Sequence, residues 1–208
     1  MNYRLAIFDF DGTLADTFPW FSGVINQVAD KYGFRRIEET EVDTIRGLEG
    51  RQILRHLGVP LWKAPMIANH LRSRMSEDIK EVSLFPGTQE LLRSLADRSL
   101  ELAVVSSNLA ENIGYVLGQD IATLFDFYAC GVSMFGKEKK LRDILKKSRV
   151  SPEHVIYIGD EIRDLQAARK VGLAFGAVSW GYNRIDAIKA HGPDHVFETI
   201  ADMATVLG

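Results

Sequence analysis

The sequence contains little cysteine, no long apolar run and no excess of basic residues. Its 208 residues include one cysteine, Cys130, so an internal disulfide framework is excluded. No uninterrupted apolar stretch approaches the ~18 residues of a membrane span, and the first apolar run meets Asp9 too early for a signal peptide. The formal net charge is −3, which disfavours nucleic acid as a partner. We therefore expect a cytoplasmic protein that binds neither membranes nor nucleic acid.

What the sequence does contain is a regular alternation of strand and helix patterns. Short apolar runs that end on small or polar residues predict strands at 4–10, 101–106, 126–131, 154–159, 173–179 and 195–197. Helical patterns lie between most of them, at 88–96, 109–117, 138–147, 162–171 and 184–189. Such alternation is typical of parallel βαβ units, so we predict an α/β fold with a doubly wound parallel sheet.

One long interval breaks this alternation. Between residues 16 and 85 the sequence shows amphipathic helix patterns, at 20–32, 50–57 and 62–79, and no convincing strand. Glycine and proline punctuate the interval and mark turns between these helices. We predict two domains: an α/β core formed by residues 1–15 and 86–208, and a helical insertion formed by residues 16–85.

Two carboxylates follow the first predicted strand, in the run Asp9-Phe10-Asp11-Gly12-Thr13-Leu14. Ligands of open α/β sheets bind at the carboxyl ends of strands. Alternation along an extended chain points Asp9 and Asp11 to the same side. Two neighbouring carboxylates are costly unless a cation neutralises them or one of them is protonated. The pair therefore predicts a catalytic or metal-binding site rather than a solvated turn.

The run from Asp9 to Thr17 resembles the first motif of the haloacid dehalogenase superfamily, in its phosphatase branch. This resemblance implies three further motifs at later strand ends. Ser106 takes the position of the second motif, where a hydroxyl can donate to a phosphoryl oxygen. The superfamily's core is Rossmann-like, which agrees with the sheet predicted above.

The third motif is a lysine at the start of a helix, and the fourth is an acidic strand end. Lys137 directly follows a glycine and is our choice for the third, with Lys139 and Lys140 as the other candidates. For the fourth, a Gly-Asp-x-x-x-Asp pattern supplies Asp160 and, one helical turn later, Asp164.

The resemblance implies a role for each of these side chains. Asp9 would be the nucleophile and Asp11 the general acid and base, while Ser106 and Lys137 would bind the phosphate. The cofactor implied is Mg²⁺, with Asp9, Asp11 through its main-chain carbonyl, and Asp160 as ligands. Asp164 is a further candidate for the same metal site.

The helical insertion resembles the mobile cap of the family, which selects the substrate. Arg46 and Arg51 flank a glycine-containing loop of the kind that faces the active site in related caps, so both are candidate anion contacts. The run Trp180-Gly181-Tyr182-Asn183 resembles phosphoglycolate-phosphatase-like members. We therefore expect a small phosphorylated metabolite as substrate, with phosphoglycolate as a candidate.

The sequence leaves two other functions and two oligomeric states open. A sugar-phosphate mutase shares every core residue named above and differs in how it protects the phosphoenzyme from water. A catalytically idle binding module could keep the fold, although such proteins usually lose motif carboxylates and this chain keeps them. The protein could be a monomer or a homodimer.

Overall fold

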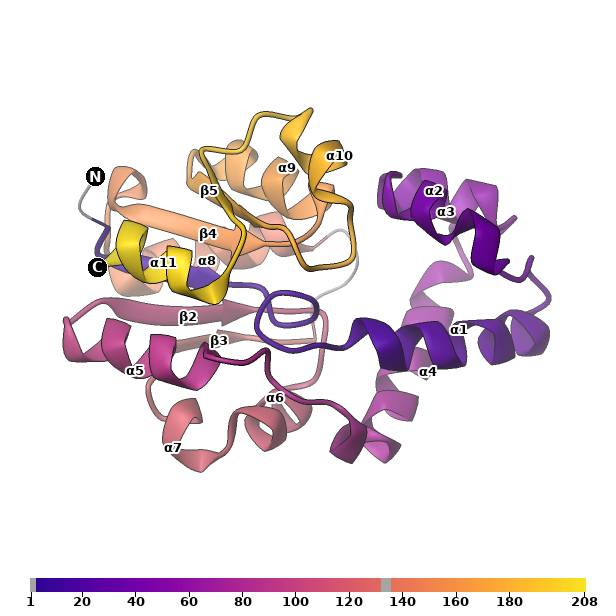
Figure 1. Cartoon of the computed structure of the whole chain (residues 1–208), viewed down its shortest axis with the longest axis horizontal. Helices are drawn as coiled ribbons and strands as arrows, with labels where there is room; N and C mark the ends of the chain where they lie inside the picture. The colour runs from indigo at the N-terminus through magenta and orange to yellow at the C-terminus, as the bar shows by residue number, and fades with distance from the viewer. Residues whose placement is uncertain (1–2, 132–135) are drawn as a thin grey trace.

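A single parallel sheet organises the computed structural model, which describes residues 3–131 and 136–208 (Figure 1). In the described residues the sheet has six strands in the order β3-β2-β1-β4-β5-β6. Their bounds are β1 Leu5–Phe8, β2 Glu101–Val105, β3 Phe127–Ala129, β4 Val155–Gly159, β5 Ala174–Val178 and β6 His195–Phe197. The chain leaves β1 toward β2 on one side and later returns to place β4 on its other side. The predicted doubly wound parallel sheet is confirmed. The strand order reverses between β1 and β4, and ligands of open α/β sheets bind at the carboxyl ends of the strands beside such a reversal.

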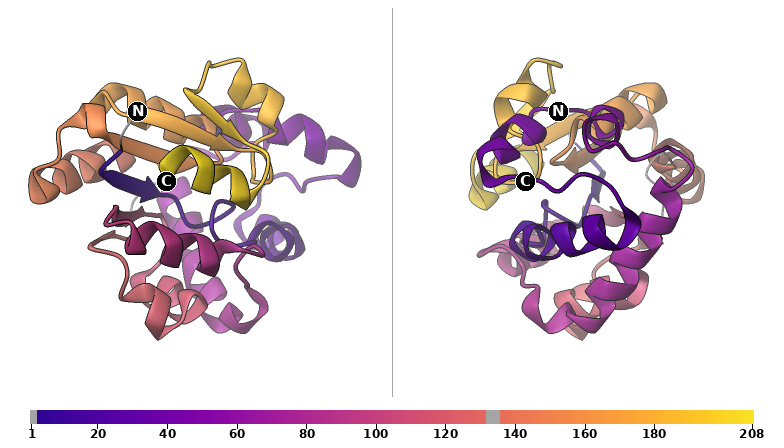
Figure 2. Two further views of the ribbon diagram at one scale, coloured as in Figure 1. Left: turned by 60° about the vertical axis from the view of Figure 1, so that its left-hand side comes forward. Right: turned by 90° about the vertical axis from the view of Figure 1, so that its right-hand side faces the viewer.

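Helices cover both faces of this sheet, which explains why its central strands are continuous apolar runs (Figures 1 and 2). On one face pack α5 Thr88–Asp97, α6 Ala110–Leu117, α7 Gln119–Ala122 and α11 Ile200–Leu207. On the other pack α8 Lys137–Ser148, α9 Ile162–Val171 and α10 Ile185–Lys189. Strand β1 serves both cores, because Ala6 and Phe8 face the first and Leu5 and Ile7 the second.

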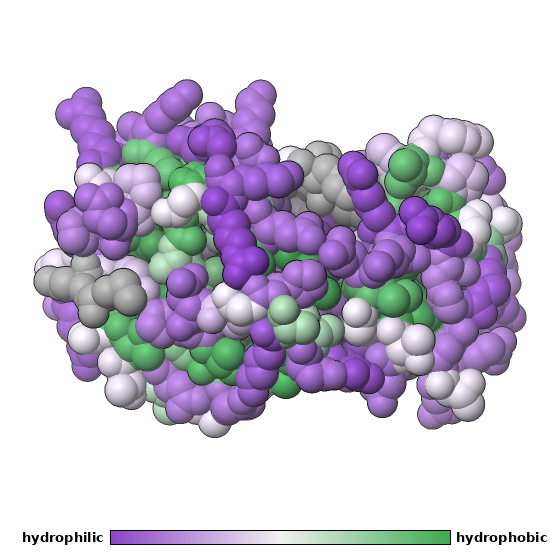
Figure 3. Space-filling model, turned by 90° about the horizontal axis from the view of Figure 1, so that it is seen from above, coloured by the Kyte–Doolittle hydropathy of each residue, from purple (hydrophilic) through white to green (hydrophobic). Residues whose placement is uncertain are grey.

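The remaining helices lie outside the sheet, at its carboxyl edge (Figure 1). They are α1 Phe18–Tyr32, α2 Val42–Arg46, α3 Gly50–His56 and α4 Ala64–Glu77, and we call residues 18–77 the helical segment. It has small apolar clusters of its own, one around Val28, Leu57 and Ile67 and one around Trp20 and Met75. Seen from above, hydrophilic residues predominate on the visible face of both parts of the molecule, with smaller apolar patches between them (Figure 3).

The stretches of chain that lead into and out of the helical segment lie side by side. The Asp16 amide donates to the Ser83 carbonyl at 2.9 Å, and the Phe85 amide donates to the Leu14 carbonyl at 3.0 Å. Ala15 also forms an isolated antiparallel bridge with Leu84. The segment is therefore attached through a short stretch of paired backbone.

Most predicted elements are present, and the differences are local. The helix predicted at 62–79 begins at Ala64, because Pro65 fits only the first turn of a helix, and it ends at Glu77. Three short helices, α2, α7 and α11, were not predicted. Helix α11 has a capping box between Thr199 and Asp202, which is the signal that could have revealed it. Among the described residues, no helix is long and apolar enough to cross a membrane.

Candidate active site

Asp9 is the first residue past β1, and the protein surrounds it almost completely. Its side chain is 3% exposed. The Phe10 amide donates to Oδ1 at 2.8 Å, and Lys137 Nζ donates to Oδ2 at 2.5 Å. The Asp9 amide still donates to the Ile158 carbonyl of β4, so the sheet ladder itself fixes the backbone of this residue. Asp9 is therefore held in one orientation by the strand behind it and the lysine in front of it.

The chain turns sharply after Asp9 and brings Asp11 against the end of β2. Ser106 Oγ donates to Asp11 Oδ2 at 3.2 Å, and Asn108 Nδ2 donates to Oδ1 at 2.9 Å. The turn depends on Gly12, which has φ +74° and whose Cβ would lie 2.3 Å from Asp160 Oδ2. A side chain at this position would therefore push the first and fourth motifs apart.

Asp160 and Asp164 approach from the end of β4 and the first turn of α9. Asp160 accepts from Thr13 Oγ1 at 2.9 Å and from the Tyr182 amide at 2.7 Å. Asp164 Oδ1 accepts from Lys137 Nζ at 2.5 Å and from Tyr157 Oη at 3.1 Å. Asp164 Oδ2 is buried and has no hydrogen-bond partner among the described residues. A buried carboxylate oxygen normally has a partner, so Asp164 Oδ2 is free to accept from a bound cation or donor.

Burial dominates the electrostatics of this cluster. It raises the pKa of Asp9 to about 8, even though the neighbouring Lys137 ammonium lowers it. Burial also raises the pKa of Asp160 well above its usual value, and the negative charges of Glu161 and Asp9 add to the effect. For Lys137, burial lowers the pKa, but the negative charges of Asp164 and Asp9 outweigh burial and raise it above the usual value. The positive charge of Lys137 thus does not neutralise the buried carboxylates around it.

The donor set of this cluster fits a hard divalent cation. Oxygens of Asp9, Asp160 and Asp164 lie within 4.8 Å of one another, and all three residues are buried. Together with Asp11 they make four carboxylates, and Lys137 is one cation in direct contact with two of them. A divalent ion together with one bound proton would balance the three remaining negative charges. Carboxylate oxygens are the ligands that Mg²⁺ prefers.

The structure brings six of the predicted site residues together and separates two. Those that converge are Asp9, Asp11, Ser106, Lys137, Asp160 and Asp164. Of the three lysine candidates, Lys137 alone is buried, whereas Lys139 is exposed and Lys140 is half-buried. Arg46 lies at the junction with the helical segment and donates to two main-chain carbonyls, and Arg51 is exposed on α3.

Sequence reasoning missed several residues that hold the predicted ones in place. Asn108 contacts Asp11, Tyr157 contacts Asp164, and Thr13 and Tyr182 contact Asp160. Asn108 and Tyr182 both follow strands, β2 and β5, that end at the same edge of the sheet. That shared edge is the signal that could have identified them, because loops at the carboxyl ends of parallel strands carry the functional side chains.

Comparison with known proteins agrees with this geometry. The family model of haloacid dehalogenase-like hydrolases matches residues 6–178. The chain is 34% identical over 198 residues to a phosphoglycolate phosphatase from Synechococcus elongatus, covering 95% of this chain and 93% of that protein. It is 28% identical over 221 residues to a 5′-nucleotidase from Pseudomonas aeruginosa, covering 100% and 96%. A haloacid dehalogenase-like hydrolase structure from Streptococcus pneumoniae shares the fold, with a TM-score of 0.80 at 20% identity and 99% coverage of each chain.

The chain therefore belongs to the haloacid dehalogenase-like hydrolases. The family model covers most of its length. In chain order, the four motifs lie at the carboxyl end of β1, the carboxyl end of β2, the start of α8 and the carboxyl end of β4. The prediction of a phosphatase of this superfamily is confirmed.

Proposed function

We propose that the protein hydrolyses a small phosphate monoester through a covalent aspartyl-phosphate, with phosphoglycolate as the first candidate substrate. The observation that carries this proposal is the pairing of Asp9 and Asp11 at one strand end. Asp9 is fixed by Lys137, and Asp11 is fixed separately by Ser106 and Asn108. The phosphoglycolate phosphatase from Synechococcus elongatus, similar over nearly the whole chain, supports the choice of substrate.

Asp9 is the nucleophile in this proposal. One of its carboxylate oxygens forms a bond to phosphorus while the bond from phosphorus to the ester oxygen breaks. Lys137 contacts Asp9 Oδ2 directly, so it is placed to share its ammonium hydrogens with the oxygens of an incoming phosphoryl group. Ser106, buried at the end of β2, offers a hydroxyl to the same group.

Asp11 serves as the general acid and then as the general base. Burial raises its pKa, although the hydrogen bonds from Asn108 and Ser106 oppose that rise. A raised pKa favours the protonated form, which can donate a proton to the leaving alkoxide. The ionised form then accepts a proton from the water that hydrolyses the aspartyl-phosphate.

Mg²⁺ is the cofactor that we propose for the carboxylate cluster. Asp9, Asp160 and Asp164 would hold it, together with the main-chain carbonyl of Asp11. When bound, the ion supplies positive charge that offsets the charge of the phosphoryl oxygens. We also propose that residues 16–85 act as the cap over a core made of residues 1–15 and 86–208.

The direct test is phosphate release from a panel of esters with the purified full-length chain. The panel contains para-nitrophenyl phosphate, phosphoglycolate, a nucleoside monophosphate and glucose 1-phosphate, each assayed with MgCl₂ and with EDTA. We expect turnover in MgCl₂ that EDTA abolishes. Interconversion of glucose phosphates without phosphate release would instead indicate a mutase, and the absence of any reaction would contradict both.

Metal binding has a consequence for stability that does not depend on turnover. A ligand that binds only the folded state at about 100 times its Kd stabilises that state by about 2.7 kcal/mol. For a chain of this size we expect MgCl₂ to raise Tm by roughly 5–10 °C relative to EDTA, measured by circular dichroism. Asp160→Asn and Asp164→Asn should each remove most of the shift. Equal Tm values for the wild type in MgCl₂ and EDTA would contradict the metal site.

Gly181→Ala should damage the site from the loop that follows β5. A Cβ at Gly181 would lie 2.1 Å from Asp160 Cβ and 2.4 Å from Asp160 Oδ2, so the carboxylate must move. Misplacing a site residue by about 1 Å can cost on the order of 100-fold in rate, and we expect kcat/KM to fall about 10- to 100-fold. Gly114→Ala on α6 is the matched control, because nothing lies within 4 Å of its added methyl group. Equal activity in the two variants would contradict the predicted contact.

A further inference from the structure

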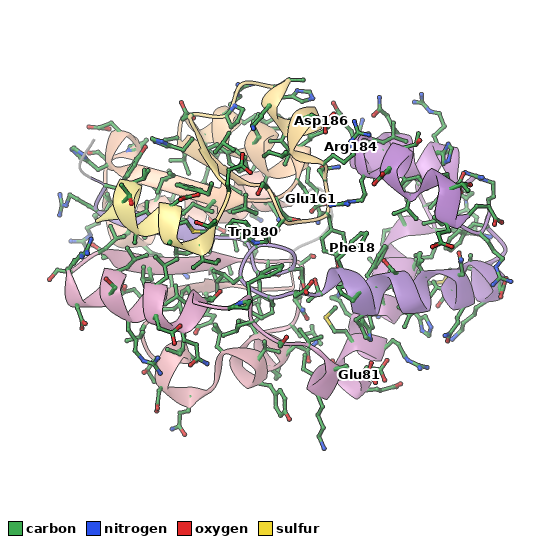
Figure 4. All side chains as sticks on the ribbon, viewed as in Figure 1. Phe18, Glu81, Glu161, Trp180, Arg184 and Asp186 are labelled. Atoms are coloured by element: carbon green, nitrogen blue, oxygen red, sulfur yellow. The ribbon has the colours of Figure 1, made fainter. Side chains whose placement is uncertain are left out.

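The loop of residues 180–184, which follows β5, touches both the carboxylate cluster and the helical segment. Figure 4 shows Trp180 and Arg184 of this loop, with Phe18 of α1 and Glu161 before α9, near the junction between the sheet and the helical segment. We call this stretch the junction loop. Beyond its contact with Asp160, the motifs and the proposed chemistry assign it no role.

On the core side, the junction loop binds Asp160 through its backbone. The Tyr182 amide donates to Asp160 Oδ2 at 2.7 Å, and the Asn183 amide donates to the Asp160 carbonyl at 3.2 Å. Asn183 Oδ1 accepts from the Ile162 amide at 2.9 Å, at the start of α9. Trp180 Nε1 donates to the Thr13 carbonyl at 3.2 Å. The position of the loop is thus fixed by the first and fourth motifs.

On the other side, the same loop binds the turn between α2 and α3. Asn183 Nδ2 donates to the carbonyls of Arg46 and Leu48, at 2.7 and 3.1 Å. The Arg184 amide also donates to the Arg46 carbonyl, at 2.9 Å. In return, the Arg46 guanidinium donates to the carbonyls of Gly181 and Tyr182, at 2.9 and 3.1 Å. Five hydrogen bonds therefore join the two segments.

Aromatic contacts extend this junction to the root of α1. The Tyr182 ring packs edge-on against Phe18 and Phe21, with centroids 5.2 and 5.5 Å apart, and its hydroxyl lies 3.0 Å from Thr17 Oγ1. The Arg46 guanidinium lies 5.1 Å from the centre of the Phe18 ring. The Arg46 guanidinium thus makes two hydrogen bonds to the junction loop and lies over the Phe18 ring, so it joins the helical segment to the loop.

We propose that Arg46 and Asn183 are positioning residues that dock the helical segment on the junction loop before substrate binds. The loop that holds Asp160 also holds the turn between α2 and α3, so docking places the helical segment beside the carboxylate cluster. This inference rests on the proposed function for its kinetic part only. Its structural part concerns the free protein.

The structural test is hydrogen exchange of the Arg184 amide in the full-length chain without substrate. This amide donates to Arg46, so exchange there reports docking. Arg46→Met keeps an apolar stem but removes both donors, and Asn183→Asp keeps the oxygen that faces Ile162 but removes the amide donor. Since each variant loses two hydrogen bonds, we expect the amide to exchange at least about tenfold faster in both. Asp186→Asn is the control: its side chain pairs with the Arg184 side chain outside the junction, and exchange should stay within about twofold of the wild type.

The kinetic test separates docking from direct substrate binding. Undocking lowers the fraction of binding-competent protein, so KM should rise about tenfold in both variants while kcat stays within about threefold. Arg46→Lys keeps the positive charge but cannot bridge two carbonyls as the guanidinium does, so it should behave like Arg46→Met. Exchange in the β1 amides and the circular dichroism spectrum should match the wild type, which shows that the variants fold.

Two results would overturn the proposal. If Arg46→Met raises KM but leaves Arg184 exchange unchanged, and Arg46→Lys restores KM, Arg46 contacts the substrate instead of the loop. If exchange of the Arg184 amide rises but KM does not change in either variant, docking does not position the helical segment for substrate binding. Should the wild type hydrolyse no phosphate ester, the proposed function fails, and the exchange measurement still decides whether the junction loop docks the helical segment.

Discussion

Asp9→Asn is expected to lower kcat by on the order of 10⁴-fold or more, which is the scale of loss when a covalent nucleophile is removed. The amide is nearly the same size as the carboxylate but cannot form the bond to phosphorus. The remaining positive charge of Lys137 has no intermediate left to stabilise. Phosphate release from para-nitrophenyl phosphate and from phosphoglycolate measures the effect.

The fold of this variant should be intact, which makes the comparison clean. Asp9→Asn removes one of several buried carboxylates, while Lys137 keeps its second partner, Asp164, at 2.5 Å. We therefore expect a Tm no lower than that of the wild type. A variant that folds normally and keeps more than about a hundredth of the activity would show that Asp9 is not the nucleophile.

Asp11→Asn should slow the reaction by about 10²- to 10⁴-fold, the usual contribution of a general acid or base, and should do so by a different route. Asp9 can still form the aspartyl-phosphate, but no carboxylate takes the proton from the hydrolytic water. We expect covalent phosphate to accumulate on the protein, detected by intact-mass spectrometry after an acid quench. The wild type, quenched in the same way, should carry much less.

The leaving group supplies a second readout for Asp11. An aryl leaving group needs little help from an acid, whereas an alkyl alkoxide needs a proton. The loss of kcat/KM in Asp11→Asn, which reports formation of the aspartyl-phosphate, should therefore be larger for phosphoglycolate than for para-nitrophenyl phosphate. Equal residual activities in Asp9→Asn and Asp11→Asn, with no covalent phosphate in either, would contradict the proposed division of roles.

The sequence was most informative where chemistry and strand ends coincide. Asp9 and Asp160 follow runs of buried apolar residues, and the alternation of strands and helices places such ends at one edge of the sheet. The short spacing from Asp160 to Asp164 is also readable, because one helical turn returns the second side chain toward the first. Periodicity and the order of elements locate these strand ends, whereas the resemblance to the superfamily is what selected Asp160 and Asp164 as site residues.

The lysine shows the limit of that reasoning. Lys137, Lys139 and Lys140 share one helix, and the sequence separates them only by the glycine before Lys137. The structure separates them by burial, since Lys137 lies between Asp9 and Asp164. Burial depends on how α8 is rotated against the sheet, which a single sequence does not specify. The catalytic role of Lys137 stays a prediction.

Contacts between distant segments were beyond sequence reasoning for a similar reason. Arg46 stands beside a glycine in a helical region, and the resemblance of this loop to those of related caps made it a candidate for binding an anion. The structure shows its guanidinium on the carbonyls of Gly181 and Tyr182, 135 and 136 residues further along the chain. Main-chain carbonyls are present at every residue and leave no trace in the sequence. Pairings of this kind require the tertiary arrangement.

The paired backbone at the root of the helical segment has a consequence for modular exchange. Leu14 precedes the helical segment and Phe85 follows it, and a hydrogen bond of 3.0 Å joins these two residues. Because the exit and the entry coincide, a helical module of another length could be grafted between them without changing the order or spacing of the strands. Under the cap and core that we propose, this arrangement would let the part of the gene that encodes the carboxylate cluster stay constant while the inserted part varies with the substrate.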